Sequence, residues 1–237
     1  MPEKWEAPGK RERAKSQVLP RILQPRRSGF RKTFNCMVAR ERNHFAFARV
    51  PGIPLEMPAP LTPAIFLDRD GTIMEEADYC SSPEQVRIIA GVPRALRGLK
   101  SAGFRLVIVT NQSGIGRGYY TLADYEAVQA RLLGLLGDGL IDATYFCPEA
   151  PEAKSPRRKP SPEMVLEAAR DLGLDLARSW FVGDKAIDVQ CGHAAGTRSI
   201  LVRTGHGHGE EAGRADFVAK DFASAAAFIL SPADASQ

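Results

Sequence analysis

The chain has 237 residues, 44% of them hydrophobic, and a formal net charge of +4 at pH 7, which is enough to bury the core of one domain of ordinary size. No apolar run approaches the roughly 20 residues that span a bilayer, and the charged start of the chain lacks the apolar core of a secretory signal. Four scattered cysteines exclude a dense disulfide framework, so we expect a cytoplasmic protein.

The basic charge is concentrated at the start of the chain. Residues 1–57 hold 13 Lys/Arg and 5 Asp/Glu, a balance of +8, so the remaining residues carry −4. Residues 1–60 are interrupted by prolines and show no regular periodicity, which predicts a disordered, basic extension. Such an arm can bind nucleic acid or a membrane surface. We favour the simpler interpretation, an extension without a role or a start assigned too early with Met57 as the true beginning, and expect neither a nucleic-acid nor a membrane partner.

From Pro63 onward, strand and helix signals alternate, which predicts an α/β domain with a doubly wound parallel sheet over residues 61–232 and a short tail over 233–237. Short apolar runs predict buried strands at 64–67, 104–109, 143–146, 180–184 and 199–202. Helical spacing predicts helices from Gly91 to Gly103, from Thr121 to Gly137, from Ser161 as N-cap to about Leu172, around Val189 and Ala194, and from Ala223 to Leu230.

Two further details of the second helix are predicted. A loop rich in glycine, residues 114–118, leads into it. Its apolar face is predicted to comprise Leu122, Tyr125, Val128, Leu132 and Leu135.

Polar side chains follow three of the predicted strands where they end. Asp68 and Asp70 follow the first strand, Thr110 and Asn111 the second, and Asp184 the fourth. Strand ends converge in a doubly wound sheet, so these groups can meet in one crevice, together with Lys159 from a loop. A single aspartate at such a place is often only a helix N-cap, but the set as a whole favours a site.

The two carboxylates suit phosphoryl transfer. Asp68 can attack phosphorus and form an acyl phosphate, which divides one difficult hydrolysis into two easier steps. Asp70 can protonate the leaving oxygen and then activate water.

A cation must offset the repulsion between a carboxylate and a phosphate. Asp184, Asp68 and a backbone carbonyl offer the hard oxygen ligands that Mg²⁺ prefers. Lys159 can balance the phosphoryl oxygens and the hydroxyl of Thr110 can donate to them. Asp188, four residues after Asp184, is expected to orient the metal site rather than ligate the ion.

These motifs resemble the four signature motifs of the haloacid dehalogenase-like phosphatases: Asp68-Arg69-Asp70-Gly71-Thr72, Thr110-Asn111, Lys159, and Gly183-Asp184 with Asp188. The resemblance covers roughly residues 63–230. Within that superfamily, residues 110–118, 158–160 and 183–185 are similar to the branch that contains D-glycero-D-manno-heptose 1,7-bisphosphate 7-phosphatase and histidinol phosphatase.

The resemblance implies roles for individual residues. Asp68 is then the nucleophile, Asp70 the proton donor and base, and Thr110 and Lys159 the groups that stabilise the phosphoryl group. The residues expected to contact substrate are Asn111, Gln112, Ser113, Arg117, Arg158 and Lys185. Mg²⁺ would be held by Asp68, Asp184 and the carbonyl of Asp70. The branch lacks a cap domain and this chain shows no inserted domain, so a small, extended sugar phosphate is expected. A monomer is also expected.

One region departs from this branch. Many relatives carry a zinc loop with Cys-x-His and then Cys-x-Cys, whereas this chain has Cys147-Pro148-Glu149 and then Ser155-Pro156-Arg157. One cysteine cannot assemble a four-ligand zinc site, so no zinc is predicted. His206-Gly207-His208 is interpreted as a solvated loop, and Cys191 as an inert residue of a packed helix.

The sequence thus predicts a Mg²⁺-dependent phosphomonoesterase acting through an aspartyl-phosphate, with heptose 1,7-bisphosphate as the favoured substrate and loss of the 7-phosphate. Histidinol phosphate is the alternative within the class. A 3′-phosphatase of nucleic-acid ends, using the basic arm, is the alternative from another class, and a catalytically silent binding protein is disfavoured. Specificity is expected to reside around Glu75–Tyr79, Arg117 and Arg158.

Overall fold

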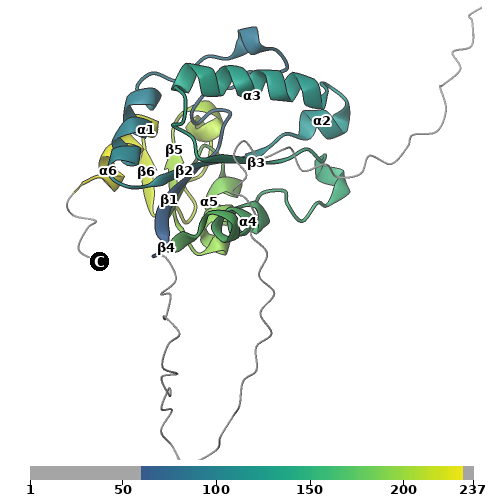
Figure 1. Ribbon diagram of the computed structural model, residues 1–237. Helices are drawn as coiled ribbons and strands as arrows, with labels where there is room; N and C mark the ends of the chain where they lie inside the picture. The colour runs from purple at the N-terminus through teal and green to yellow at the C-terminus, as the bar shows by residue number, and fades with distance from the viewer. Residues whose placement is uncertain (1–59, 232–237) are drawn as a thin grey trace, which may run out of the picture. The chain divides into compact units, whose positions relative to one another are not determined.

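The computed structural model describes residues 60–231. The predicted basic extension, apart from Pro60, and the C-terminal tail lie outside the described residues. The described chain forms a six-stranded parallel sheet in the order β3-β2-β1-β4-β5-β6 (Figure 1). Its strands are β1 (Thr62–Leu67), β2 (Arg105–Asn111), β3 (Ala143–Cys147), β4 (Leu174–Gly183), β5 (Arg198–Val202) and β6 (Phe217–Ala219).

Helices cover both faces of the sheet, as a doubly wound fold requires. Buried residues of α1 (Val92–Ser101), α3 (Leu122–Leu136) and α6 (Phe222–Ile229) belong to one hydrophobic core. Buried residues of α4 (Glu163–Leu172) and α5 (Ala186–Ala195) belong to the other (Figure 1). The predicted fold class is therefore confirmed.

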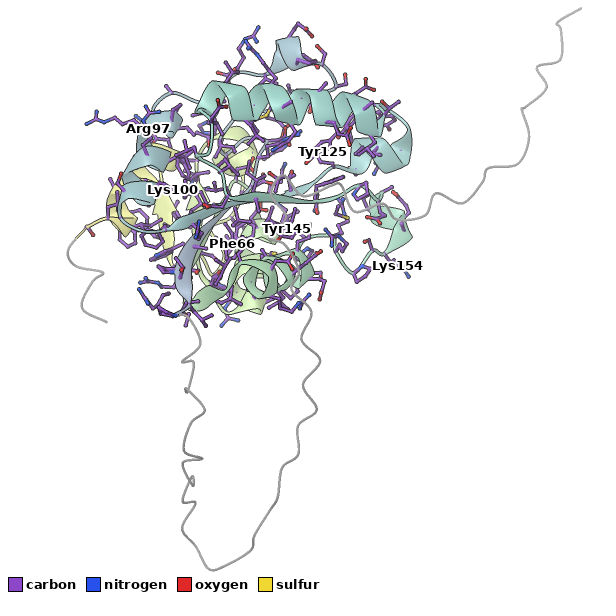
Figure 2. The ribbon with its side chains drawn as sticks, in the orientation of Figure 1. Phe66, Arg97, Lys100, Tyr125, Tyr145 and Lys154 are labelled. Atoms are coloured by element: carbon purple, nitrogen blue, oxygen red, sulfur yellow. The ribbon has the colours of Figure 1, made fainter. Side chains whose placement is uncertain are left out.

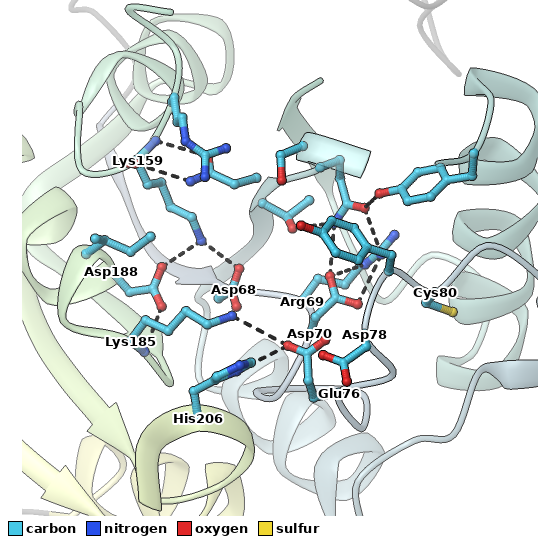
Figure 3. A pocket seen from close by; sticks show the side chains of 18 residues that line it. Asp68, Arg69, Asp70, Glu76, Asp78, Cys80, Lys159, Lys185, Asp188 and His206 are labelled. Carbon is cyan, nitrogen blue, oxygen red and sulfur yellow. Dashed lines mark hydrogen bonds and ion pairs between the residues drawn. The ribbon is translucent and has the colours of Figure 1, made fainter. Parts of the chain in front are cut away.

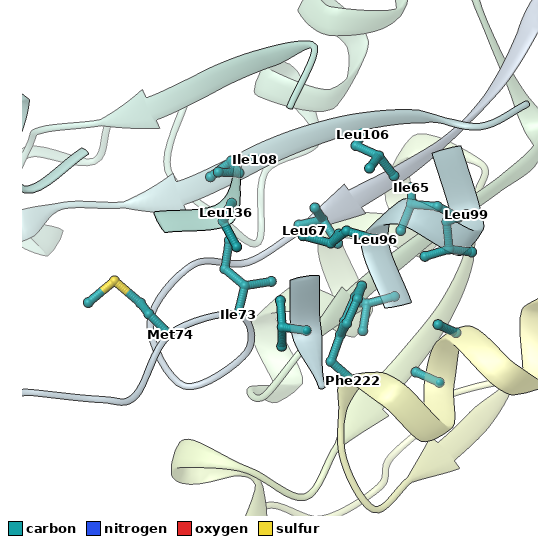
Figure 4. Packing of buried hydrophobic residues seen from close by; sticks show 14 of the residues in the cluster. Ile65, Leu67, Ile73, Met74, Leu96, Leu99, Leu106, Ile108, Leu136 and Phe222 are labelled. Carbon is teal, nitrogen blue, oxygen red and sulfur yellow. The ribbon is translucent and has the colours of Figure 1, made fainter. Parts of the chain in front are cut away.

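Alternation along the strands separates the two cores. On β1, Ile65 and Leu67 pack in the first core, with Leu96 of α1 and Phe222 of α6 (Figure 4). Phe66, between them in sequence, packs in the second core (Figure 2). Successive strand side chains point to opposite faces, so a strand covered on both sides must be apolar throughout. This is why the short apolar runs in the sequence correctly predict buried strands.

Capping residues define the helix ends close to where the sequence predicts them. The hydroxyl of Thr121 accepts a bond of 3.2 Å from the backbone N–H of Asp124 and so caps α3. Gly103, just beyond α1, has a φ of 93°, a conformation that only glycine adopts at little cost. Helix α4 begins at Glu163, slightly later than the predicted cap at Ser161 suggests.

Other predicted details differ from the structure. The glycine-rich loop contains a short helix, α2 (Ser113–Arg117), and β6 was not predicted. On α3, Leu122 and Leu135 are exposed, and Leu136 is buried in place of Leu135. Ala194 is exposed on α5. A helix rotates by about 100° per residue, so an error of one position moves a side chain from the core to the surface.

The strand register brings the polar strand ends together. Leu67 of β1 pairs with Ile108 of β2 and with Val182 of β4, so Asp68 comes one residue and Asp184 two residues after this paired position. The strand order reverses beside β1, which is where open α/β sheets bind ligands. Within residues 60–231, no domain is inserted between β1 and β2 or between β2 and β4, and no helix is long and apolar enough to cross a membrane.

Candidate active site

A pocket of about 290 Å³ lies at the carboxyl edge of the sheet beside β1 (Figure 3). It is lined by predicted site residues from four segments: Asp68, Asp70, Thr110, Asn111, Gln112, Ser113, Arg158, Lys159, Lys185 and Asp188. Asp184 is fully buried next to it. The strand ends thus bring together nearly all of the side chains that the sequence selects.

Asp68 and Lys159 form a buried ion pair at the centre of the pocket. The ammonium of Lys159 lies 2.6 Å from Asp68 Oδ1 and 2.6 Å from Asp188 Oδ1, and it donates to the carbonyl of Val109 at 3.0 Å. Burial disfavours its charge, but the carboxylates of Asp188 and Asp68 outweigh that effect and hold the pKa of Lys159 above its ordinary value. Lys159 is therefore a permanent cation beside Asp68.

Asn111 positions Lys159 through its backbone. Its side-chain amide donates to the carbonyl of Lys159 at 3.2 Å and accepts from the N–H of Lys159 at 3.0 Å. This two-point contact joins the end of β2 to the loop that carries the lysine. The structure therefore assigns Asn111 a contact within the protein in addition to its place in the pocket lining.

Asp184 and Asp188 form an acidic pair next to Asp68. Ligand atoms of the three carboxylates lie within 4.8 Å of one another. Burial, followed by the charge of Asp68, raises the pKa of Asp184 to about 8. Burial also raises the pKa of Asp188 to about 6, although the charge of Lys159 opposes the shift. Asp188 Oδ2 also accepts from the backbone N–H of Lys185 at 3.0 Å.

The carboxylates of Asp68, Asp184 and Asp188 suit a hard divalent cation. Asp184 Oδ1 is buried and has no hydrogen-bond partner in the described part of the chain, which is costly unless an ion or water contacts it. Gly71 and Gly205 pack against the same carboxylate, since a Cβ at either position would lie within 2.4 Å of Asp184 Oδ2. Mg²⁺ prefers carboxylate and carbonyl oxygens of this kind.

Asp70 belongs to a separate hydrogen-bonded network in the pocket wall. Arg69 Nε and Nη2 bind its two carboxylate oxygens at 3.0 and 3.1 Å, and Gln112 Nε2 donates to Asp70 Oδ2 at 2.9 Å. Burial by itself raises the pKa of Asp70, but Arg69 and the bond from Gln112 outweigh it, so the pKa lies below its usual value. Asp70 is therefore ionised at neutral pH before substrate binds.

His206 lies on a solvated loop, as predicted, and its imidazole is about half exposed, but the prediction did not place it at the pocket. It lines the pocket, its backbone N–H donates to Asp184 Oδ2 at 2.8 Å, and its Nδ1 lies 3.3 Å from Glu76 Oε2 (Figure 3). Lys185 Nζ lies 3.5 Å from the same Glu76 oxygen. The signal for His206 was present, because it follows β5 at the same edge of the sheet as the other site residues.

The substrate contact expected of Arg117 stays a prediction. It lies outside the pocket lining, at the end of α2, where its Nη2 is 3.4 Å from Glu152. The predicted specificity segment does reach the pocket, through Glu76, Asp78 and Tyr79. Asp78 and Tyr79 have φ values of 32° and 65°, and this strained backbone is typical of functional loops.

The cysteines of the described chain are free and buried. Burial raises the pKa of Cys191 to about 12, which agrees with its interpretation as an inert residue. Cys147 Sγ lies 3.1 Å from Glu149 Oε2, and Arg157 from the same loop forms an ion pair with Glu167 on α4.

The chain is similar to curated heptose bisphosphate phosphatases. It is 44% identical over 157 residues to D-glycero-D-manno-heptose-1,7-bisphosphate 7-phosphatase of Chlorobaculum tepidum, covering 60% of this chain and 79% of the relative. It is 44% identical over 154 residues to D-glycero-beta-D-manno-heptose-1,7-bisphosphate 7-phosphatase of Escherichia coli K12, covering 60% and 80%.

Family models and solved structures agree with these relatives. The HAD-hydrolase-like family model matches residues 156–225. The D,D-heptose 1,7-bisphosphate phosphatase from B. bronchiseptica, complexed with magnesium and phosphate, superposes with a TM-score of 0.66 at 33% identity, over 71% of this chain and 98% of that one. The enzyme from Burkholderia thailandensis gives 0.54 at 28% identity, over 72% and 99%. The chain belongs to the D-glycero-D-manno-heptose 1,7-bisphosphate 7-phosphatase branch of the haloacid dehalogenase-like phosphatases.

Proposed function

We propose that this protein removes the 7-phosphate of D-glycero-D-manno-heptose 1,7-bisphosphate with the help of Mg²⁺, through an aspartyl-phosphate on Asp68. The observation that supports this most strongly is the buried arrangement of Asp68, Lys159 and Asp184 at the open edge of the sheet. The similarity to enzymes named for this substrate, over about four fifths of their length, supports the substrate.

In the first half-reaction, Asp68 attacks phosphorus. Oδ1 of Asp68 is held by Lys159, so Oδ2 is the oxygen that attacks. A P–O bond to Asp68 forms as the P–O bond to the sugar breaks, and Asp70 gives its proton to the leaving oxygen. Asp70 is ionised in the free enzyme, and the doubly negative phosphoryl group favours its protonated form when substrate binds.

In the second half-reaction, the carboxylate of Asp70 takes a proton from water. The water oxygen bonds to phosphorus, the bond from phosphorus to Asp68 breaks, and inorganic phosphate leaves. Lys159 and the hydroxyl of Thr110 stabilise the negative charge on the phosphoryl oxygens. Asp68, Asp184 and the carbonyl of Asp70 would hold Mg²⁺, which offsets the repulsion between carboxylate and phosphate.

The function is tested by measuring phosphate release from a panel of substrates. We expect the highest kcat/KM with heptose 1,7-bisphosphate, and lower values with histidinol phosphate, other sugar phosphates and a 3′-phosphorylated oligonucleotide. Preference for the oligonucleotide, reduced by salt and by deletion of residues 1–56, would contradict this and favour the nucleic-acid alternative. Preference for histidinol phosphate would retain the reaction and replace the substrate.

We expect the loop at residues 147–158 to be ordered without zinc. Of the positions that carry zinc ligands in many relatives, only Cys147 is a thiol. The loop is instead tied to α4 by the ion pair of Arg157 with Glu167, and to α2 by a bond of 2.9 Å from the N–H of Gly116 to the carbonyl of Pro148. Arg158 donates to the carbonyl of Glu149 at 3.4 Å within the loop.

Metal removal should abolish turnover, and readdition of Mg²⁺ alone should restore it. Without metal, the pKa of Asp184 is about 8, so Mg²⁺ must displace a proton at neutral pH. The affinity for Mg²⁺ should therefore increase as the pH rises from 6 to 8, by up to about tenfold per pH unit. Titration of chelator-treated protein at several pH values measures this, and elemental analysis of the untreated protein measures zinc. A pH-independent affinity, or stoichiometric zinc, would contradict these expectations.

A further inference from the structure

The hydrogen-bonding capacity of the Gln112 side chain is fully used inside the protein. Its Oε1 accepts from Arg69 Nη2 at 3.0 Å and from the hydroxyl of Tyr120 at 2.7 Å. Its Nε2 donates to Asp70 Oδ2 and to Thr110 Oγ1, each at 2.9 Å. An amide offers two acceptor sites and two donor hydrogens. Gln112 therefore has no hydrogen bond left for a substrate, and its residue is only 3% exposed.

The orientation of this amide is determined by its neighbours. Arg69 can only donate hydrogen bonds and the carboxylate of Asp70 can only accept them. A flipped amide would place Nε2 against Arg69 and Oε1 against Asp70, two repulsive contacts in a buried place. Only the observed orientation satisfies both neighbours. The side chain of Gln112 therefore links Arg69 to the carboxylate of Asp70 through its own hydrogen bonds.

The same amide orients the hydroxyl of Thr110. A threonine hydroxyl has one proton to donate, and its oxygen here accepts from Gln112. The proton of Thr110 is thus available to an acceptor in the pocket, where the phosphoryl oxygens would lie. Gln112 connects this hydroxyl to Asp70, so two groups with different tasks are held by one side chain.

The glycine-rich segment, residues 114–118, allows the Tyr120 hydroxyl to reach Gln112. A Cβ at position 114 would lie 2.1 Å from the ring of Tyr120, so only glycine allows that ring to approach α2. The approach brings the Tyr120 hydroxyl to Gln112. Burial raises the pKa of Tyr120 to about 12, so the hydroxyl keeps its proton and donates at neutral pH.

We propose that Gln112 is a positioning residue of the acid–base step, which aligns Asp70 and Thr110 and makes no contact with substrate. This revises the substrate-contact role that the sequence resemblance implies. The proposal rests on the proposed phosphatase function with Asp70 as its acid and base.

The test compares Gln112→Met with Gln129→Met. Gln129 is a matched control, because it is also nearly buried and donates to a threonine, Thr144 at 3.2 Å, outside the pocket. The substrates are heptose 1,7-bisphosphate, phenyl phosphate and p-nitrophenyl phosphate. The two aryl esters have similar size, but only the nitrophenolate leaves readily without a proton. The quantity compared is kcat/KM, which reports the steps up to phosphoryl transfer.

For Gln112→Met, kcat/KM should fall about 100-fold with the sugar phosphate and with phenyl phosphate, and less than about tenfold with p-nitrophenyl phosphate. Gln129→Met should match the wild type with all three. Equal losses with both aryl esters would indicate general damage to the site, and a raised KM with unchanged kcat would indicate substrate contact. Either result would overturn the proposal, as would unchanged kinetics.

Two further variants extend the test, and the first keeps it decisive if Gln112→Met is unstable. Tyr120→Phe removes one hydroxyl. The fall in kcat/KM should depend on the leaving group in the same way, but should be about a tenth as large. Adding Gln112→Met to Asp70→Asn should cost little more than Asp70→Asn alone, because the two act as a unit. If the wild-type protein is inactive on all three esters, the phosphatase function itself is refuted. If the wild type is active but the variants lose the same factor of kcat/KM with both aryl esters, only the role of Gln112 is refuted.

Discussion

Replacing Asp68 by asparagine should reduce phosphate release by at least about 10⁴-fold with every phosphate ester. The amide keeps the size of the side chain but cannot act as the attacking nucleophile. Asp68 is 5% exposed and bonded to Lys159, so asparagine should be accommodated with the fold intact. Phosphate release in a single-turnover experiment measures the effect, and labelled phosphate trapped on the wild-type protein but not on the variant would locate the intermediate.

Asp175→Asn is the matched control for this substitution. Asp175 lies near the start of β4, at the opposite end of the strand from the pocket. The substitution Asp175→Asn should therefore leave kcat and KM unchanged. Activity of Asp68→Asn above about 1% of the wild type, in a preparation free of deamidated protein, would rule out Asp68 as the nucleophile.

Replacing Lys159 by methionine should impair both stability and catalysis. The substitution leaves the carboxylates of Asp68 and Asp188 buried without their cation, which typically costs about 3–5 kcal/mol in the free energy of unfolding. For a domain of this size that corresponds to a fall in Tm of about 10 °C. Turnover should fall by about 10²–10³-fold, because a preorganised positive charge is lost from the phosphoryl site.

The stability loss should depend on pH in a defined direction. Burial already raises the pKa of Asp188 to about 6 against the attraction of Lys159, so removing the lysine raises it further. A folded-state pKa above the unfolded value near 3.9 means that the folded state binds more protons between the two values, so stability falls as the pH rises through that range. Lys159→Met should thus be more destabilised at pH 8 than at pH 5.

A double variant separates the two effects of Lys159. Lys159→Met with Asp188→Asn removes both partners of one buried pair, and should recover part of the lost Tm without recovering activity. Thermal unfolding at pH 5 and pH 8 measures the first effect, and phosphate release the second. An unchanged Tm in the single variant would contradict the buried ion pair.

The elements that were predicted correctly are those whose signal is local. The strand at 64–67 is apolar on both faces because helices cover both sides of the sheet, and that pattern can be seen without neighbours. The site followed from the same strands, since Asp68, Thr110 and Asp184 stand at their ends. Helix α2 was missed because Gly114 and Gly116 disfavour helices in isolation; here they permit close packing against Tyr120 and Pro148.

The roles of side chains within the site were harder to predict. Asn111 is the last residue of β2 and Gln112 follows it, but whether an amide faces the ligand or the protein depends on partners distant in sequence. His206 follows a predicted strand at this edge, but its contact with Asp184 depends on the turn of the loop after β5. Arg117 was expected at the pocket, but the end of α2 directs its side chain towards Glu152.

The open carboxyl edge of the sheet has a consequence for the fate of the aspartyl-phosphate. Residues 60–231 contribute no domain that folds over this edge, and Lys159 already contacts Asp68 in the protein without substrate. We therefore expect small solutes to reach the proposed intermediate as water does. Short alcohols present at high concentration should compete with water for the phosphoryl group and yield new phosphate esters, so that the enzyme also acts as a phosphotransferase.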